Sequence, residues 1–165
     1  MKIPKIILFM LLVLPSAALS QTLPRAEVQD ASGRSMRTES WIDGKTPFVV
    51  SFWGSTCKPC IQELDTMSEN YEEWSAATPF RVIAVAVDDS RSVARARSLA
   101  AGRGWSDFTL AFDVNSDLKR ALNITSVPRV FLYDRNGRLV YTHTGYKPGD
   151  EYELLRAVRK LSSGK

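Results

Sequence analysis

Short apolar runs alternate along this chain with longer segments in which apolar residues recur every three or four positions. The runs at residues 48–53 and 80–87 are apolar on both faces, which indicates buried central strands. Residues 57–77 and the segment that begins near residue 150 each carry one apolar stripe, which indicates amphipathic helices. Weaker patterns predict strands at 23–30, 110–113, 130–133 and 139–143 and helices at about 88–101 and 116–122.

The order of these elements predicts a fold class. Strand, helix, strand and helix follow one another in the first half, so the strands are expected to run parallel and to be joined by crossover helices. Asn136-Gly137, between the last two strands, is typical of a hairpin turn, which adds an antiparallel edge. The sequence therefore predicts an α/β fold with a central mixed β-sheet and helices on both faces.

Residues 1–20 differ from the rest of the chain. Lys2 and Lys5 precede an apolar core of nine residues, and small residues stand at and near Ser20. This order is typical of a secretory signal peptide that is cleaved near Ser20. A retained membrane anchor is the alternative, but the apolar core is shorter than the roughly 20 residues of a bilayer span. We therefore expect a signal peptide, a single domain over residues 21–165, and a periplasmic or otherwise extracytoplasmic location.

The charge of the chain adds little to this picture. It has 22 basic and 18 acidic residues and a formal net charge of +4, of which Lys2 and Lys5 leave with the signal peptide. Such a weak excess predicts no nucleic-acid partner, and the arginines between residues 91 and 103 are expected on a solvated helix face and its loop. We expect a monomer.

The candidate chemistry lies in the chain's two cysteines, Cys57 and Cys60, which follow the first buried strand and open the predicted helix 57–77. A helix N-terminus has unpaired N–H groups and a partial positive charge, and both stabilise a thiolate. The thiolate is the form that attacks a disulfide. Thr56 is the expected N-cap of this helix, and Pro59 fits its first turn.

Three other roles suit this cysteine pair less well. A disulfide that closes so short a loop contributes little stability, because the entropic gain grows with loop length. A zinc site needs about four ligands, whereas the chain has two cysteines and one histidine, His143. A buried and inert pair conflicts with a position at a turn. We therefore predict a redox-active pair and no metal site, with His143 on a strand surface rather than as a base or ligand.

The sequence around the cysteines resembles a known family. Residues 53–60, Trp-Gly-Ser-Thr-Cys-Lys-Pro-Cys, look like the redox-active turn of the thioredoxin-like fold. Val127-Pro128 lies about seventy residues further on, where that fold places a cis-proline. The mature chain as a whole resembles the TlpA/ResA branch of secreted thiol-disulfide oxidoreductases. This resemblance implies that Cys57 attacks a partner's disulfide and that Cys60 resolves the mixed disulfide.

The resemblance also implies roles for the residues beside the pair. Lys58 and Pro59 would tune the reduction potential, and a cation beside the first thiol favours its thiolate. Pro128 would pack in the cis form beside the disulfide, and the backbone of Val127 would pair with an extended substrate. Trp53 is the aromatic residue expected near the substrate.

The resemblance further places a carboxylate near the site. Glu63, one helical turn after the second cysteine, matches an acidic residue of this branch and would raise the thiol pKa values and relay protons. An exposed helix position is the alternative for Glu63. Ser51 stands where thioredoxin itself has a buried aspartate, so a proton relay would have to be built differently. The remaining tryptophans, expected to be packing residues, are Trp41, Trp74 and Trp105.

Together these features predict an extracytoplasmic thiol-disulfide oxidoreductase. It would reduce disulfides in secreted proteins or apocytochrome c through a Cys57–Cys60 dithiol–disulfide cycle, with a membrane electron donor and without an organic cofactor. The direction of exchange stays open, since a disulfide oxidase or isomerase would use the same residues. A non-catalytic metal-binding module is a further alternative, although the copper chaperones of this fold have a wider cysteine spacing.

Overall fold

The structure is a computed structural model that describes residues 21–163. The predicted signal peptide, residues 1–20, lies outside the described residues. In chain order the elements are β1 (Glu27–Gln29), β2 (Ser35–Arg37), the 3-10 helix η1 (Thr38–Trp41), β3 (Phe48–Trp53), α1 (Lys58–Ala77), β4 (Arg81–Ala86), α2 (Val93–Gly102), β5 (Thr109–Phe112), α3 (Asp117–Ala121), β6 (Arg129–Tyr133), β7 (Leu139–Thr144) and α4 (Asp150–Ser163).

The strands form one mixed sheet in the order β2-β1-β5-β4-β3-β6-β7. The three central strands, β5, β4 and β3, run parallel, whereas β6 and β7 add an antiparallel edge. In the parallel register Trp53 lies opposite Ala86, so β3 and β4 end at the same edge of the sheet. The predicted mixed sheet is confirmed, and the turns that follow these two strands are neighbours.

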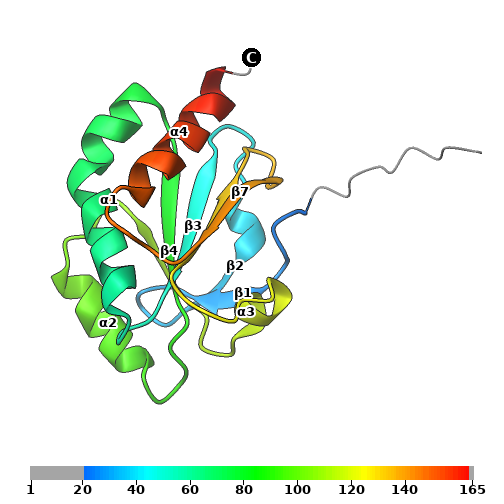
Figure 1. The fold of residues 1–165 in the computed structure, drawn as a ribbon. Coiled ribbons are helices and arrows are strands. Elements are labelled where there is room, and N and C mark those ends of the chain that lie inside the picture. The colour runs from blue at the N-terminus through cyan, green and yellow to red at the C-terminus, as the bar shows by residue number, and fades with distance from the viewer. Residues whose placement is uncertain (1–20, 164–165) are drawn as a thin grey trace, which may run out of the picture.

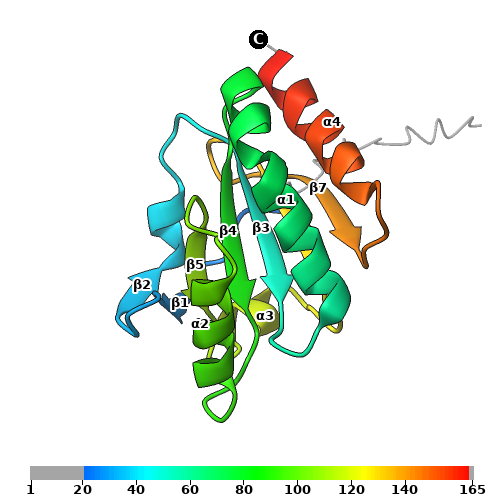
Figure 2. The ribbon, with the colours of Figure 1, turned by 90° about the vertical axis from the view of Figure 1, so that its left-hand side faces the viewer.

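The helices divide unequally between the two faces of the sheet. Helices α1, α2 and α4 cover one face, and α3 lies on the other (Figures 1 and 2). Each face has its own apolar cluster, and the side chains of β3 alternate between the two: Val49 and Trp53 pack toward α1, whereas Val50 and Phe52 pack on the opposite face. No helix of the described chain is long and apolar enough to cross a bilayer.

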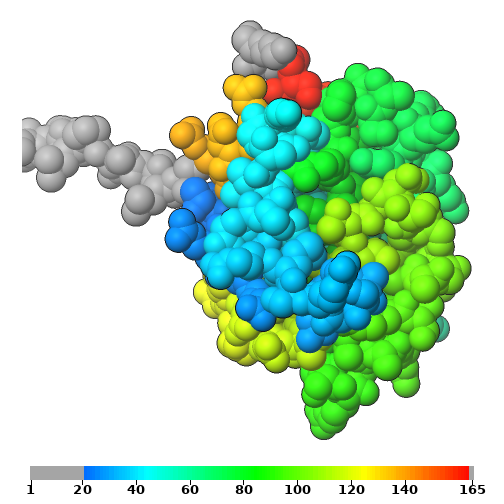
Figure 3. Space-filling view, turned by 180° about the vertical axis from the view of Figure 1, so that it is seen from behind, coloured from blue at the N-terminus to red at the C-terminus, as the bar shows by residue number. Residues whose placement is uncertain are grey.

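The second face is closed largely by the N-terminal part of the domain. The hairpin β1–β2 and the helix η1, coloured blue to cyan in Figure 3, spread over this side next to α3. Trp41 of η1 is 3% exposed and belongs to the apolar cluster of this face. Trp41, Trp74 and Trp105 are all buried, as predicted for packing residues.

Helix α2 begins later than its sequence pattern predicts. The segment after β4 was expected to be helical from residue 88, but α2 starts at Val93. The Asp89 carboxylate accepts hydrogen bonds from the N–H groups of Arg91 and Ser92, and this local turn competes with helical backbone. The chain therefore makes a loop above the end of β4 before the helix starts.

The turn between β6 and β7 depends on Gly137. Its φ of +78° is a left-handed conformation that side chains disfavour. A Cβ atom at this position would lie 2.6 Å from Cδ1 of Ile42. The carbonyl of Gly137 also accepts a hydrogen bond from the N–H of Leu23, which ties the start of the domain to this turn. Conformation and packing thus both select glycine here.

We expect Gly137→Ala to lower the free energy of unfolding by about 2 to 3 kcal/mol, because it combines left-handed strain with crowding against Ile42. Gly145→Ala is the matched control, since Gly145 has a similar φ of +81° but nothing within 4 Å of the added Cβ. That variant should lose only about 1 kcal/mol. Urea unfolding followed by circular dichroism measures both, and equal losses would show that the contact with Ile42 carries no cost.

Candidate active site

The two cysteines lie where β3 passes into α1, and they form a disulfide with Cα atoms 5.3 Å apart. Cys57 is the N-cap of α1, and its Sγ accepts a hydrogen bond of 3.3 Å from the backbone N–H of Cys60. The prediction that Thr56 is the N-cap is therefore wrong by one residue. Cys57 is half-buried, whereas Cys60 is fully buried. The first sulfur thus has both the helix N-terminus and access to the surface.

The turn before the cysteines is fastened to the neighbouring strand by Asp88. This carboxylate follows β4, is 9% exposed, and accepts hydrogen bonds from both the backbone N–H and the hydroxyl of Ser55, at 2.9 and 2.5 Å. The sequence pattern assigned Asp88 only to the start of a helix. Its place directly after a buried parallel strand was the available signal, because neighbouring parallel strands end at the same edge. Asp88 and Ser55 hold Cys57 at a fixed place beside β4.

The Val127–Pro128 peptide bond is cis, as predicted. Pro128 is buried, and Val127 is half-buried at the rim of an open groove of about 640 Å³. Cys57 lines the same groove, together with the loop after β4 and Lys119 of α3. The structure therefore brings the first cysteine and the residue before the cis-proline to one surface depression.

Trp53 does not lie where the resemblance placed it. Its side chain is 0% exposed and packs edge to face on Trp105, with ring centroids 5.1 Å apart. Trp105 in turn donates a hydrogen bond from its indole N–H to Asp65 of α1. The expectation that Trp53 contacts a substrate is therefore wrong for this structure, because adjacent packing layers cover the ring completely. Trp53 instead packs in the apolar cluster that contains Cys60 and so supports the active-site turn from inside the protein.

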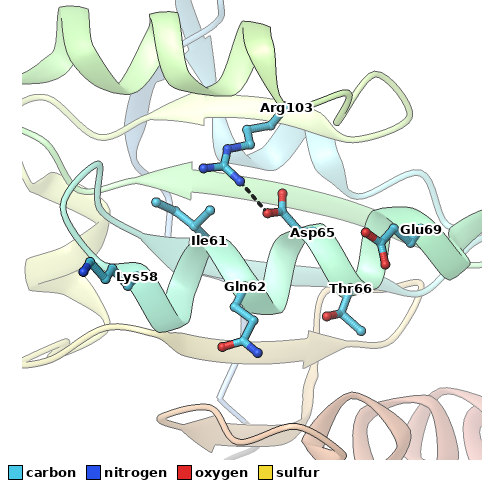
Figure 4. A pocket seen from close by; sticks show the side chains of 7 residues that line it. All are labelled: Lys58, Ile61, Gln62, Asp65, Thr66, Glu69 and Arg103. Carbon is cyan, nitrogen blue, oxygen red and sulfur yellow. Dashed lines mark hydrogen bonds and ion pairs between the residues drawn. The ribbon is translucent and has the colours of Figure 1, made fainter.

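Lys58 and Pro59 are both exposed in the first turn of α1. Lys58 stands at one end of a shallow hollow along the outer side of this helix, shown in Figure 4. The hollow is bordered further along by the ion pair of Asp65 with Arg103, at 2.7 Å. Neither cysteine lines this hollow, whereas Cys57 lines the groove beside Val127, so that groove is the better candidate for the reacting partner.

Glu63 lies on the inner side of α1 and is 4% exposed, so the alternative of a surface glutamate is excluded. Its Oε2 accepts a hydrogen bond of 3.3 Å from the hydroxyl of Ser51 on β3. The pKa of Glu63 is raised to about 8, mainly because burial disfavours the charged form. The hydrogen bond from Ser51 lowers this pKa, and the negative charges of Asp150 and Glu151 on α4 contribute to raising it. The carboxyl group reaches the strand position at which thioredoxin has its aspartate.

His143 lies on β7 with its side chain 34% exposed, and its Nε2 is 3.1 Å from Oδ2 of Asp150. The position on a strand surface agrees with the prediction. The sequence did not indicate that Asp150 and Glu151 would face Glu63, since this depends on how α4 packs against α1 and the sheet. Among residues 21–163, no three histidine, cysteine or acidic side chains are grouped as metal ligands.

Known proteins resemble this chain along most of its length. Thiol-disulfide oxidoreductase ResA of Geobacillus kaustophilus is 29% identical over 139 residues, which cover 84% of this chain and 76% of that protein. The thiol:disulfide interchange protein DsbE homolog of Paracoccus denitrificans is 27% identical, covering 84% and 73%. The solution structure of a thioredoxin-like protein from Porphyromonas gingivalis is 38% identical, has a TM-score of 0.76, and covers 87% of this chain and 94% of that one.

The fold, the placed disulfide and these relatives define a thioredoxin-like enzyme, a thiol-disulfide oxidoreductase of the ResA and DsbE type. The family model of AhpC/TSA matches residues 19–142. This chain belongs to the AhpC/TSA family. The predicted fold and the predicted enzyme class are thereby confirmed.

The raised pKa of Glu63 predicts a pH dependence of stability. The folded state holds this proton more tightly than the unfolded chain does. The stability that the protonated Glu63 contributes is therefore complete below pH 4.5 and is lost as the pH rises through about 8. Between these pH values the free energy of unfolding of the wild type should fall by about 2 to 4 kcal/mol relative to that of Glu63→Gln, which has no titrating group at this position. Urea unfolding of both proteins at pH 5 and pH 8 measures this difference, and parallel pH profiles would contradict it.

Proposed function

We propose that this protein is an extracytoplasmic reductase of protein disulfides, with secreted proteins and apocytochrome c as the substrate class. The observation that carries the proposal is the asymmetry of the disulfide. Cys57 lines an open groove at the start of a helix, and Cys60 is buried one turn from Glu63. One sulfur is thus placed to meet a partner, and the other is placed to exchange a proton inside the protein.

In the first step the Cys57 thiolate attacks one sulfur of the partner's disulfide. A mixed disulfide forms, and the partner's other sulfur leaves as a thiolate that takes a proton from water. The N–H of Cys60, which already points at Sγ of Cys57, stabilises the attacking thiolate, and exposed Lys58 adds a positive charge nearby. The backbone of Val127 beside Pro128 offers an extended partner segment a place to pair along the groove.

In the second step Cys60 resolves the mixed disulfide. Its thiol gives a proton to the Glu63 carboxylate, and the new thiolate attacks Sγ of Cys57. The bond to the partner breaks, the partner leaves as a thiolate that is protonated by water, and the Cys57–Cys60 disulfide forms. Two electrons have then passed to the partner. A membrane electron donor returns two electrons to the disulfide, and the cycle uses no organic cofactor.

The location rests on the start of the sequence. A basic start, a short apolar core and small residues at Ser20 are typical of a secretory signal peptide. In an oxidising compartment a reductase must be recharged from outside that compartment, which is why we propose a membrane donor. The names of the relatives, ResA and DsbE, agree with exchange between thiols and disulfides.

The charges behind the disulfide favour reduction of substrates over their oxidation. A strongly oxidising pair needs a reduced state in which the thiolate is stabilised. Here the groups that face Glu63 from α4 are acidic, and they raise its pKa. These negative charges, joined by Glu63 itself once it ionises, oppose a thiolate at Cys60 and so favour the disulfide form. The positive charge of Lys58 acts in the opposite sense, because it favours a thiolate at Cys57, while Pro59 stiffens the turn. The balance of these effects sets part of the reduction potential.

Partner trapping tests the proposed exchange. Cys60→Ser, expressed with residues 1–20 intact, should accumulate mixed disulfides through Cys57, because the bond to the partner can no longer be resolved. Cys57→Ser is the matched control and should trap no partner through the buried Cys60. Non-reducing electrophoresis and mass spectrometry detect the adducts. Absence of adducts, or equal adducts in both variants, would contradict the assignment of roles.

The direction of exchange is tested by the reduction potential. We expect the wild type to equilibrate with a glutathione or dithiothreitol buffer at a potential below about −200 mV, in the range of reducing thioredoxin-like proteins. A value near −120 mV, typical of a strong oxidant, would support the oxidase alternative instead. Mass spectrometry after alkylation of the free thiols gives the reduced fraction of the protein at each buffer potential.

A further inference from the structure

We propose that His143 and Asp150 are positioning residues of the redox cycle. The pair connects the buried carboxyl group of Glu63 with solvent and determines the net charge beside that group. This inference rests on the proposed function, because it concerns the proton that Glu63 exchanges with Cys60. It assigns a role to His143 and Asp150, neither of which takes part in the exchange steps described above.

The first observation is a small cavity on the inner side of α1, at Glu63. It lies between α1, β6, β7 and the first turn of α4, and its polar wall consists of Glu63, Tyr141, His143, Asp150 and Glu151. The rest of the wall is apolar. Elements that are far apart in the sequence thus place five titratable groups around one space, and one of these groups is the carboxyl group next to Cys60.

The second observation is a gradient of exposure across this cavity. Glu63 is 4% exposed, whereas the side chains of His143 and Asp150 are 34% and 28% exposed and form a pair at 3.1 Å. Asp150 Oδ2 also accepts a hydrogen bond from the N–H of Lys147, which fixes the carboxylate at the start of α4. The pair therefore stands where the cavity meets water, and the buried acid stands at its closed end.

The third observation is the sign of the surrounding charges. Glu63 faces neutral Ser51 from β3, Tyr141 and His143 from β7, and Asp150 and Glu151 from α4. On its own helix, Cys60 lies one turn before it. Tyr146, in the loop after β7, feels the charge of Glu63 as well. Of the described groups that line the cavity, His143 is the one that can become a cation.

Together these groups form a path for protons between Glu63 and solvent, and their charges influence the ionisation of Glu63. When the donor reduces the disulfide, the Cys60 thiolate takes a proton from Glu63, and the carboxylate left behind must recover one from water. The ionised Asp150 and Glu151 oppose a third negative charge and so favour reprotonation of Glu63. Protonation of His143 offsets the charge of Asp150 and favours the Glu63 carboxylate, which is the form that accepts the proton of Cys60 in the opposite half of the cycle.

The direct test is the titration of the Glu63 carboxyl carbon, followed by NMR in the oxidised, selectively labelled full domain. Asp150→Asn removes one negative charge and should lower the midpoint of this titration by roughly half to one pH unit. His143→Gln removes the one group lining the cavity that can become a cation and should raise the midpoint, and a lowered midpoint would contradict its role. Glu72→Gln, an exposed carboxylate of α1 outside the cavity, is the matched control and should leave the midpoint in place.

The kinetic test follows reduction of the disulfide by dithiothreitol from pH 5 to pH 10. The pH–rate profile of Asp150→Asn should shift in the same direction as its titration, whereas that of Glu72→Gln should match the wild type. Unchanged Glu63 midpoints in Asp150→Asn, with folding verified by circular dichroism, would overturn the inference. The proposed function would survive that result as long as Cys60→Ser still traps partners, and it would fail separately if trapping failed while the titration shifted.

Discussion

Strand β3 lies between the two apolar clusters of the domain, and all six of its residues are buried. A strand in that position cannot shift along its neighbours without moving every side chain to the wrong face. Its register with β4 is therefore fixed, and so is the point at which the chain leaves the sheet. The disulfide, the Asp88–Ser55 contact and the start of α1 all depend on that point. The position of the reactive turn is therefore set by β3, all of whose residues are buried.

The site combines two opposite electrostatic environments within the first two turns of α1. Cys57 caps a helix N-terminus, where negative charge is stabilised. Glu63, on the buried side of the same helix, faces further carboxylates of α4 and keeps a raised pKa. A polar group buried in this way costs stability unless it stays protonated or finds partners. In the proposed cycle, the same burial gives the resolving cysteine a group with which to exchange a proton.

The sequence predicted the parts of the site that depend on local pattern. The strand–turn–helix around the cysteines, the cis-proline and the packing role of three tryptophans followed from spacing and resemblance. The burial of Trp53, the contact of Asp88 with Ser55 and the approach of Asp150 to Glu63 did not. Each joins residues from separate elements, and their distance is set by the packing of whole helices and strands rather than by periodicity. Ser51 shows the limit well: its contact with Glu63 could be seen only once α1 lay on β3.

The burial of Trp53 has an optical consequence. Its indole ring belongs to the same apolar cluster as Cys60 and stacks edge to face with Trp105. Disulfides quench the emission of nearby indole rings, and thiols do so less. Opening the disulfide therefore changes the surroundings of this ring, and the emission of the protein becomes linked to its redox state. The residue that supports the reactive turn would then also make the redox state visible without any added label.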